Sequence, residues 1–140
     1  MALRKIRQEK DPILRKISKT VPTVTDNVRM LAADMLETMY HSAGVGLAAP
    51  QVGILKRLIV IDVGDGPIVM INPEILHQSG EQEGQEGCLS CPGKAGLVKR
   101  PMNVKAEATN LNGEKFTVDG EALLARAICH EIDHLNGKLF

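Results

Sequence analysis

The chain has 140 residues, and its seventeen basic and seventeen acidic side chains give a formal net charge of zero. It contains no Trp, one Tyr and two Phe, so aliphatic residues must form the core, and it has neither a basic surface nor an aromatic platform for nucleic acid. No segment approaches the roughly 20 apolar residues of a transmembrane helix, and the first residues lack the apolar core of a signal peptide. We therefore expect a single domain over residues 1–140, without a membrane segment or a direct nucleic-acid site.

Two helices are predicted in the first third of the chain. Asp11-Pro12 is typical of an N-cap followed by proline in the first turn, and it predicts a short helix through Lys16. Asp26 is the predicted cap of a longer helix that ends before Gly44. The apolar positions of this longer helix recur at spacings of three and four, as in an amphipathic helix: Val28, Leu31, Met35 and Met39.

The middle of the chain carries the predicted strands. The aliphatic run 58–63 predicts a buried strand, and residues 68–71 form its hairpin partner. Apolar and polar residues alternate over 104–109, which predicts a half-exposed strand. Asn112-Gly113 predicts a two-residue hairpin turn into a further strand at 116–118. Because strands and helices are segregated along the chain, we expect an α+β fold with mostly antiparallel sheets.

The last predicted helix starts with Asp119 as its N-cap, runs from residue 120 to about Asn136 and ends with Gly137 as its C-cap. One face carries His130 and the residues within roughly 60° of it, which are Leu123, Arg126, Ala127 and His134. The opposite face enters the core through Leu124, Ile128, Ile132 and Leu135. The sheets should therefore pack around this C-terminal helix, with an apolar pocket at Leu123 and Ala127 beside the histidines.

His130 to His134 has the form His-Glu-x-x-His. Residues four apart share one face of a helix, so His130 and His134 can bind one metal ion. Glu131 lies about 100° further round, too far to share the ion easily but near enough to hydrogen-bond a water molecule on it. Two ligands and a base on one helical turn indicate metal-assisted hydrolysis.

A catalytic site of this kind needs a third protein ligand and an open fourth position. The odd number of cysteines favours a reducing cytosol, where a cysteine is more often a ligand or a buried residue than half of a disulfide. Cys129 points away from the neighbouring histidine and suits core packing, whereas His41 and His77 are typical of surface positions. The spacing of Cys88 and Cys91 fits either a closed Cys₂His₂ site or one ligand beside a packing residue.

The segment Gly44–Gln51 combines glycines, small apolar residues, a proline and one polar side chain. Its glycines allow close backbone approach or unusual φ values. The segment is either a helix C-cap followed by a packed turn, or a loop that presents the Gln51 amide as a donor to an oxyanion.

Taken in this order, three segments resemble the peptide deformylase family: Gly44–Gln51, Glu86–Ser90 and His130–Gly137. Asp11–Arg15 near the start and Val60–Pro73 in the middle are also similar to that family. The resemblance covers nearly the whole chain.

The resemblance implies a metal site formed by Cys88, His130 and His134, with water as the fourth ligand. Cys91 is then not a ligand and occupies a position where the family usually has an aliphatic residue. The implied cofactor is one divalent ion, Fe²⁺ in the cell, with Zn²⁺, Ni²⁺ or Co²⁺ as alternatives, because one thiolate and two imidazoles suit any of these.

The implied reaction is hydrolysis of the N-formyl group of N-formylmethionyl nascent peptides, which releases formate. Water on the metal is the nucleophile, and Glu131 acts first as general base and then as general acid. Gln51 and the backbone N–H of Leu89 are the implied oxyanion donors. Glu86 and Arg100 match a pair that supports the loop with the cysteine ligand.

The methionine side chain is expected in the pocket beside the histidines, and the peptide is expected in extended form along backbone groups. The implied contact with the ribosome is transient. Many relatives continue beyond the position of Phe140, often with a helix that can help docking on the ribosome, so the resemblance does not extend to docking. The implied location is the bacterial cytoplasm or an organelle. The expected substrate-binding residues are Gly44, Val45, Gly46, Gly87, Leu123, Arg126 and Ala127.

Two other functions fit part of the pattern. An ordinary zinc peptidase would take a histidine or carboxylate as third ligand and cleave internal peptide bonds. A non-catalytic binding module stabilised by a closed Cys₂His₂ site would use Cys88 and Cys91 together and unfold when the metal is removed. It would leave Glu131 and Gln51 without a role.

Overall fold

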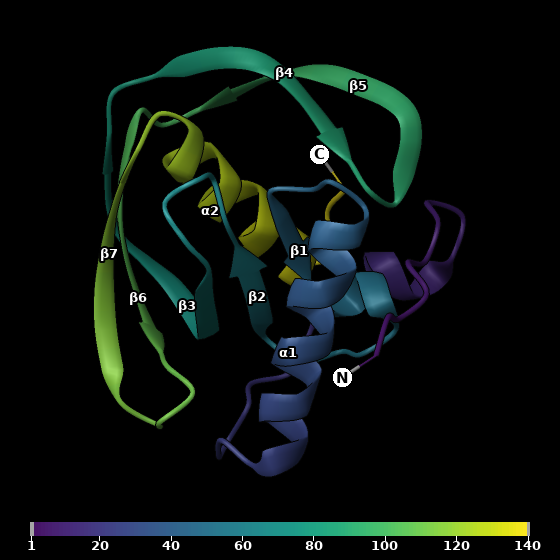
Figure 1. Cartoon of the computed structure of the whole chain (residues 1–140). Coiled ribbons are helices and arrows are strands. Elements are labelled where there is room, and N and C mark those ends of the chain that lie inside the picture. Colours follow the sequence, from purple (N-terminus) through teal and green to yellow (C-terminus); the bar gives the residue numbers. More distant parts are fainter. Residues whose placement is uncertain (1, 140) are drawn as a thin grey trace.

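The computed structural model describes residues 2–139, so the chain end at Phe140 lies outside the described range (Figure 1). None of the helices in this range is both long and apolar enough to cross a membrane. The elements in chain order are η1 (Pro12–Arg15), α1 (Asp26–His41), β1 (Gly46–Ala48), η2 (Ala49–Val52), β2 (Leu58–Ile61), β3 (Ile68–Ser79), β4 (Gln82–Cys88), β5 (Cys91–Arg100), β6 (Asn103–Thr109), β7 (Lys115–Glu121) and α2 (Leu123–Leu135).

Within the described residues the strands form a five-stranded sheet, in the order β1-β2-β3-β6-β7, and a separate hairpin of β4 and β5. Every strand pairing in both sheets is antiparallel. The expected α+β class with antiparallel sheets is confirmed. β3 is much longer than the predicted partner at 68–71, because its second half leaves β2 and pairs with β6.

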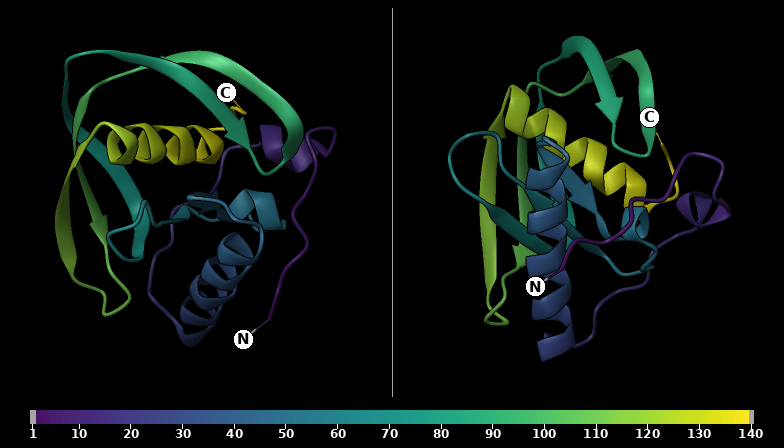
Figure 2. Two further views of the ribbon diagram at one scale, coloured as in Figure 1. Left: turned by 45° about the horizontal axis from the view of Figure 1, so that its top comes forward. Right: turned by 45° about the vertical axis from the view of Figure 1, so that its right-hand side comes forward.

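α2 lies between the β4–β5 hairpin and the five-stranded sheet, while α1 covers another side of β1 and β2 (Figure 2). The position of β2 between two apolar clusters accounts for its continuous aliphatic sequence. Ile59 and Ile61 belong to the apolar cluster around α2, whereas Leu58 and Val60 belong to the cluster around α1. A strand that is buried on both faces needs apolar side chains on both, as observed.

The predicted start of the last helix is wrong. Asp119 lies inside β7, which stays paired with β6 as far as Glu121, and α2 begins at Leu123. Ala122 makes the change of direction with a positive φ of 53°. The predicted end is confirmed, because Gly137 follows the helix with a φ of +79°, and a Cβ there would lie 2.6 Å from the Arg15 carbonyl oxygen.

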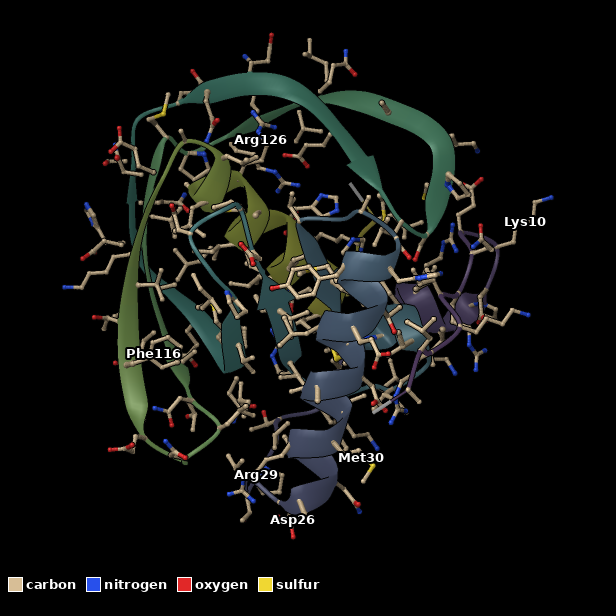
Figure 3. All side chains as sticks on the ribbon, in the orientation of Figure 1. Lys10, Asp26, Arg29, Met30, Phe116 and Arg126 are labelled. Carbon is tan, nitrogen blue, oxygen red and sulfur yellow. The ribbon has the colours of Figure 1, made fainter. Side chains whose placement is uncertain are left out.

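Three smaller expectations also need correction. The N-cap of α1 is Thr25, whose hydroxyl accepts a hydrogen bond from the backbone N–H of Val28 at 3.3 Å. Asp26 is instead the first residue of the helix, and its carboxylate pairs with Arg29 (Figure 3). The short helix after Asp11 is a 3₁₀ turn that ends at Arg15. The turn after β6 spans residues 110–114 instead of two, because the Asn110 side chain accepts backbone N–H groups from residues 112 and 114.

Candidate metal centre and active site

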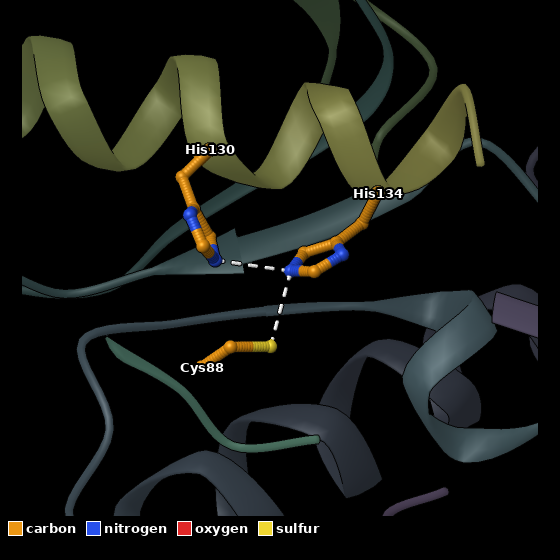
Figure 4. A group of neighbouring side chains, drawn as sticks. All are labelled: Cys88, His130 and His134. Atoms are coloured by element: carbon orange, nitrogen blue, oxygen red, sulfur yellow. Dashed lines mark hydrogen bonds between the residues drawn. The ribbon is translucent and has the colours of Figure 1, made fainter. Parts of the chain in front are cut away.

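Both histidines of the His-Glu-x-x-His segment project from the same face of α2 (Figure 4). The Nε2 atoms of His130 and His134 lie 3.0 Å apart, and the two rings meet edge to face at 84° with centroids 4.6 Å apart. Both side chains are buried. The helical spacing of four residues therefore brings two imidazole nitrogens to one point, as the sequence predicts.

The third group comes from the last residue of β4. The Sγ atom of Cys88 lies 3.5 Å from Nε2 of His134, and the ligand atoms of Cys88, His130 and His134 all lie within 4.8 Å of one another. Among the described residues this is the one such cluster of potential metal ligands, and it does not include Cys91. A closed site with two cysteines is therefore not supported.

The donor set fits a divalent ion of the first transition row. A tetrahedral ion with bonds of about 2.0 Å to nitrogen and 2.3 Å to sulfur separates its ligand atoms by roughly 3.3–3.6 Å. The two histidine nitrogens lie 3.0 Å apart, and Sγ of Cys88 lies 3.5 Å from Nε2 of His134. Burial, together with the neighbouring His130, lowers the pKa of His134 to about 3, so this ring is neutral as a ligand must be. Burial raises the pKa of the Cys88 thiol to about 12, so a bound cation is needed to displace its proton.

Glu86, Arg100 and Arg126, here called the Glu86 cluster, orient the His130 ring through its Nδ1 atom. The carboxylate of Glu86 accepts two hydrogen bonds from Arg100, both at 2.9 Å, one from Arg126 at 2.6 Å and one from Nδ1 of His130 at 2.9 Å. Burial acts to raise the pKa of Glu86, but the hydrogen bonds from Arg100 and His130 prevail and lower it to about 2. Because an ionised carboxylate only accepts, Nδ1 of His130 donates, which turns its Nε2 toward the metal position.

The same cluster joins the hairpin to α2. Glu86 and Arg100 lie on β4 and β5, while Arg126 projects from α2 toward the hairpin (Figure 3). Arg126 also approaches the backbone carbonyl oxygens of Gly84 and Val98, and Arg100 donates to Asp133 of α2 at 2.6 Å. The element that carries Cys88 is thus a hairpin tied to α2, where the sequence suggests only a loop.

Glu131 is enclosed beside the three ligand residues. Its Oε1 atom is buried, and the described residues supply no hydrogen-bond partner for it. Burial, with a smaller contribution from the charge of Glu86, raises the pKa of Glu131 to about 8. Gly46 lies against this carboxylate, since a Cβ at that position would lie 2.6 Å from Oε2. A carboxyl group with a free oxygen and a raised pKa is suited to take up and return a proton.

Gln51 projects from η2 into the same region and is 1 % exposed. Its Oε1 accepts from the backbone N–H of Ala48 at 2.9 Å, which fixes the direction of the amide. Its Nε2 points to Sγ of Cys88 at 3.5 Å and to the hydroxyl of Ser90 at 3.2 Å. The segment 44–51 therefore forms strand β1 and a 3₁₀ turn that together present an amide donor at the cluster.

A cavity of about 400 Å³ opens over the site. At one wall Gly44 packs against Leu89, where a Cβ would lie 2.8 Å from a methyl carbon of that leucine. Ala127 is buried, whereas Val45 and Leu123 are partly exposed at the rim. All the expected substrate-binding residues line the cavity: Gly44, Val45, Gly46, Gly87, Leu123, Arg126 and Ala127.

Three residues near the site were not identified from the sequence. Ser90 holds the Gln51 amide, Asp133 completes the charge network, and Gln85 lines the cavity. Asp133 could have been identified from its spacing, because it lies three residues after His130 on the same helix. The sequence contains no comparable pattern for Ser90 and Gln85, because the folding of the β4–β5 hairpin places them.

Comparison with known proteins agrees with this geometry. The family model described as polypeptide deformylase matches residues 3–140. A peptide deformylase of Agathobacter rectalis is 61% identical over 140 residues, which cover 100% of this chain and 89% of the relative. One of Acetivibrio thermocellus is also 61% identical, with 100% of this chain and 82% of the relative covered.

Solved structures show the same similarity. The peptide deformylase of Legionella pneumophila superposes with a TM-score of 0.95 at 48% identity, covering 99% of this chain and 83% of that one. The Ehrlichia chaffeensis peptide deformylase in complex with actinonin gives a TM-score of 0.98 at 37% identity, covering 100% and 87%. Together with the cluster of Cys88, His130 and His134, these matches show that the chain belongs to the polypeptide deformylase family, the metal-dependent hydrolases that remove N-formyl groups from nascent peptides.

Proposed function

We propose that Cys88, His130 and His134 hold one divalent metal ion with which this chain hydrolyses the N-formyl group of N-formylmethionyl peptides. The observation that carries the proposal is the convergence of three ligand atoms within 4.8 Å, on residues from two elements. The open cavity beside them leaves room for water and a formyl group. Glu131, with its unpartnered buried oxygen, faces this space.

The bound cation would supply Lewis-acid activation of water and of the formyl oxygen. Glu131 takes a proton from the attacking water and later delivers it to the nitrogen of the leaving amine. Nε2 of Gln51 and the backbone N–H of Leu89 donate hydrogen bonds to the formyl oxygen as negative charge develops on it. Glu86 keeps the Nδ1 proton of His130 in place throughout, so the ring does not turn.

Substrate binding follows from the walls of the cavity. Leu123 and Ala127 provide an apolar surface for the methionine side chain, and Val45 closes its edge. The backbone of Gly44, Gly46 and Gly87 lies where an extended peptide can form strand-like hydrogen bonds. Arg126 borders the cavity, but its guanidinium is occupied by Glu86, so we assign it to holding the hairpin as well.

The wider setting follows from the same proposal. We infer that residues 1–140 form one catalytic domain, because α2 contacts strands of both the large sheet and the hairpin. Fe²⁺ is the ion we propose for the cell, with Zn²⁺, Ni²⁺ or Co²⁺ able to replace it, since the mixed sulfur and nitrogen donors accept all four. The bacterial relatives support a cytoplasmic location, and a nascent substrate supports transient contact with the ribosome.

The test is formate release from formyl-Met-Ala-Ser by protein loaded anaerobically with Fe²⁺ or with Zn²⁺. Glu131→Gln serves as the matched variant, because it keeps the shape of the side chain and removes the base. We expect formate from the wild type and a decrease of about 10²–10⁴-fold in the variant, with its metal content unchanged. Folded, metal-loaded wild-type protein that releases no formate with either ion would refute the proposal.

A further inference from the structure

Cys91 has no role in the proposed reaction, yet it stands directly opposite Cys88. The two residues are Cα partners at the closed end of the β4–β5 hairpin, separated by the two turn residues Leu89 and Ser90. Opposed residues in an antiparallel pair have Cα atoms about 4.5–5.5 Å apart, and disulfides form over about 4.4–6.8 Å. The backbone therefore places the two cysteines within reach of one bond.

The side chains of Cys88 and Cys91 also share a surrounding, because both residues border the same cavity of about 400 Å³. Cys88 is partly exposed, whereas Cys91 is buried, with only 2 % of it exposed. A small oxidant in the cavity would therefore meet Cys88 first, with Cys91 positioned as the second thiol.

Glu9 of the N-terminal segment binds the hairpin at the turn between the two cysteines. The backbone N–H of Glu9 donates to the carbonyl oxygen of Ser90 at 2.8 Å, and the Glu9 carboxylate pairs with Lys94 of β5 at 2.6 Å. Gln51 holds the hydroxyl of Ser90 from the other side. The turn between the cysteines is thus fixed on both sides, which limits the backbone movement available to separate them.

We propose that Cys88 and Cys91 form a reversible oxidative modification site, in which a peroxide converts the two thiols into a disulfide. The sulfur of Cys88 attacks the peroxide, becomes a sulfenic acid and releases hydroxide, which takes up a proton to give water. The sulfur of Cys91 then attacks Cys88, the S–S bond forms, and a second water leaves. In sum, two thiols and hydrogen peroxide give one disulfide and two waters.

The consequence for the enzyme rests on the proposed function. A sulfur in a disulfide is no longer a thiolate donor, so the metal would keep only His130 and His134. The Glu86 cluster does not involve either cysteine, so the hairpin stays joined to α2 while the metal is lost. Reduction by a dithiol would restore the ligand. Cys91 would thereby protect Cys88 from irreversible oxidation.

The experiment treats Zn²⁺-loaded protein with hydrogen peroxide and follows intact mass, cysteine mapping and zinc release to a chromophoric chelator. Cys91→Val is the decisive variant, because valine fills the position without a thiol. Cys129→Ala is the matched control, since Cys129 lies on α2, is buried in the core and belongs to neither side of the bond.

For the wild type and for Cys129→Ala we expect a mass decrease of about 2 Da, a Cys88–Cys91 link and one zinc released per link, all reversed by dithiothreitol. For Cys91→Val we expect no link and a gain of about 32 Da or more at Cys88 that dithiothreitol does not reverse. The same irreversible gain in wild type and Cys91→Val, without a link, would overturn the proposal.

Zinc-free protein treated in the same way tests the disulfide separately from the metal assignment, because the link is scored by mass alone. In zinc-loaded protein, a Cys88–Cys91 link that forms while zinc remains bound would refute the release of metal and, with it, Cys88 as a ligand. A protein that binds no zinc at the start would refute the metal assignment alone, because the link is still scored by mass.

Discussion

The two elements that supply the proposed metal ligands, α2 and the β4–β5 hairpin, are held in the fold by different forces. α2 is buried along most of its length, and its apolar residues pack into the core beside the five-stranded sheet. The β4–β5 hairpin is polar, contains four glycines, and is exposed at most positions of β5. Its principal attachment to α2 in the described structure is the Glu86 cluster, together with the pair of Arg100 and Asp133.

The proposed metal centre therefore joins a helix held by apolar burial to a hairpin held largely by charged side chains. Burial of apolar surface fixes where the histidines lie, at about 25 cal/mol per Å² removed from water. Buried charge pairs hold the hairpin that carries Cys88, and such pairs add little net stability, because the cost of removing charges from water offsets their attraction. Changes in the hairpin should therefore affect metal binding more than folding.

The largest expected effect comes from removing the hairpin's own ligand. We expect Cys88→Ala to lose the bound metal. Changes in residues that only support metal ligands lower activity by about 10–100-fold, and the loss of a ligand should lower the rate of formate release by more than that. The two histidines remain on α2, so the fold should persist. Zinc content after desalting and the circular dichroism spectrum measure the two effects. A variant that keeps stoichiometric zinc would show that α2 alone forms the site.

Weakening the attachment of the hairpin should have the next largest effect. Glu86→Gln removes the charge that Arg100, Arg126 and His130 share, and we expect metal affinity to fall about 10–100-fold. Competition with a calibrated chelator measures the affinity. Glu83→Gln is the control, because it makes the same change at an exposed position of β4. Equal affinities in the two variants would contradict a positioning role for the Glu86 cluster.

A substitution in β1, outside both α2 and the β4–β5 hairpin, tests the position of the proposed base. Gly46→Ala places a Cβ 2.6 Å from Oε2 of Glu131, so the base must shift. We expect kcat to fall about tenfold, as small misplacements of catalytic groups do, with metal content unchanged. Gly96→Ala in β5 is the control, because a Cβ there meets nothing within 4 Å. An unchanged kcat would show that Glu131 does not need its observed position.

The smallest effect concerns a second segment held by polar contacts. The backbone N–H of Ala2 donates to Asp34 of α1 at 2.7 Å, and this contact, with a further one from Arg4, lowers the pKa of Asp34 below 3.8. A lowered pKa contributes stability above the unfolded value, which is lost as the pH falls through the folded value. The stability advantage of wild type over Asp34→Asn should therefore shrink in acid.

Urea unfolding of both proteins between about pH 7 and pH 3 measures that advantage. Asp65→Asn, at an exposed turn, is the control that should follow the wild type. An advantage of wild type over Asp34→Asn that is constant across this range would show that the charge of Asp34 does not hold the N-terminal segment.

The features that depend on local periodicity could be predicted from the amino-acid sequence alone. The four-residue spacing put His130 and His134 on one helical face, and the aliphatic run at Leu58 marked a strand buried on both sides. Gly137 marked the end of α2, because its positive φ and close approach to Arg15 exclude a side chain. In each case the sequence pattern spans only a few residues, and the regular geometry of the helix or strand then determines which way the side chains point.

The features that depend on pairing between distant residues could not be predicted in this way, because they arise when the chain folds. Asp119 has the residue type of a helix cap, but pairing with β6 keeps it in a strand, since a ladder of hydrogen bonds outweighs one local preference. Cys88 and Cys91 are equivalent by spacing, and the hairpin register directs Cys88 to the histidines. The Glu86 cluster joins residues 14, 40 and 44 positions apart. Such contacts have no periodic signal, because chain folding alone brings their members together.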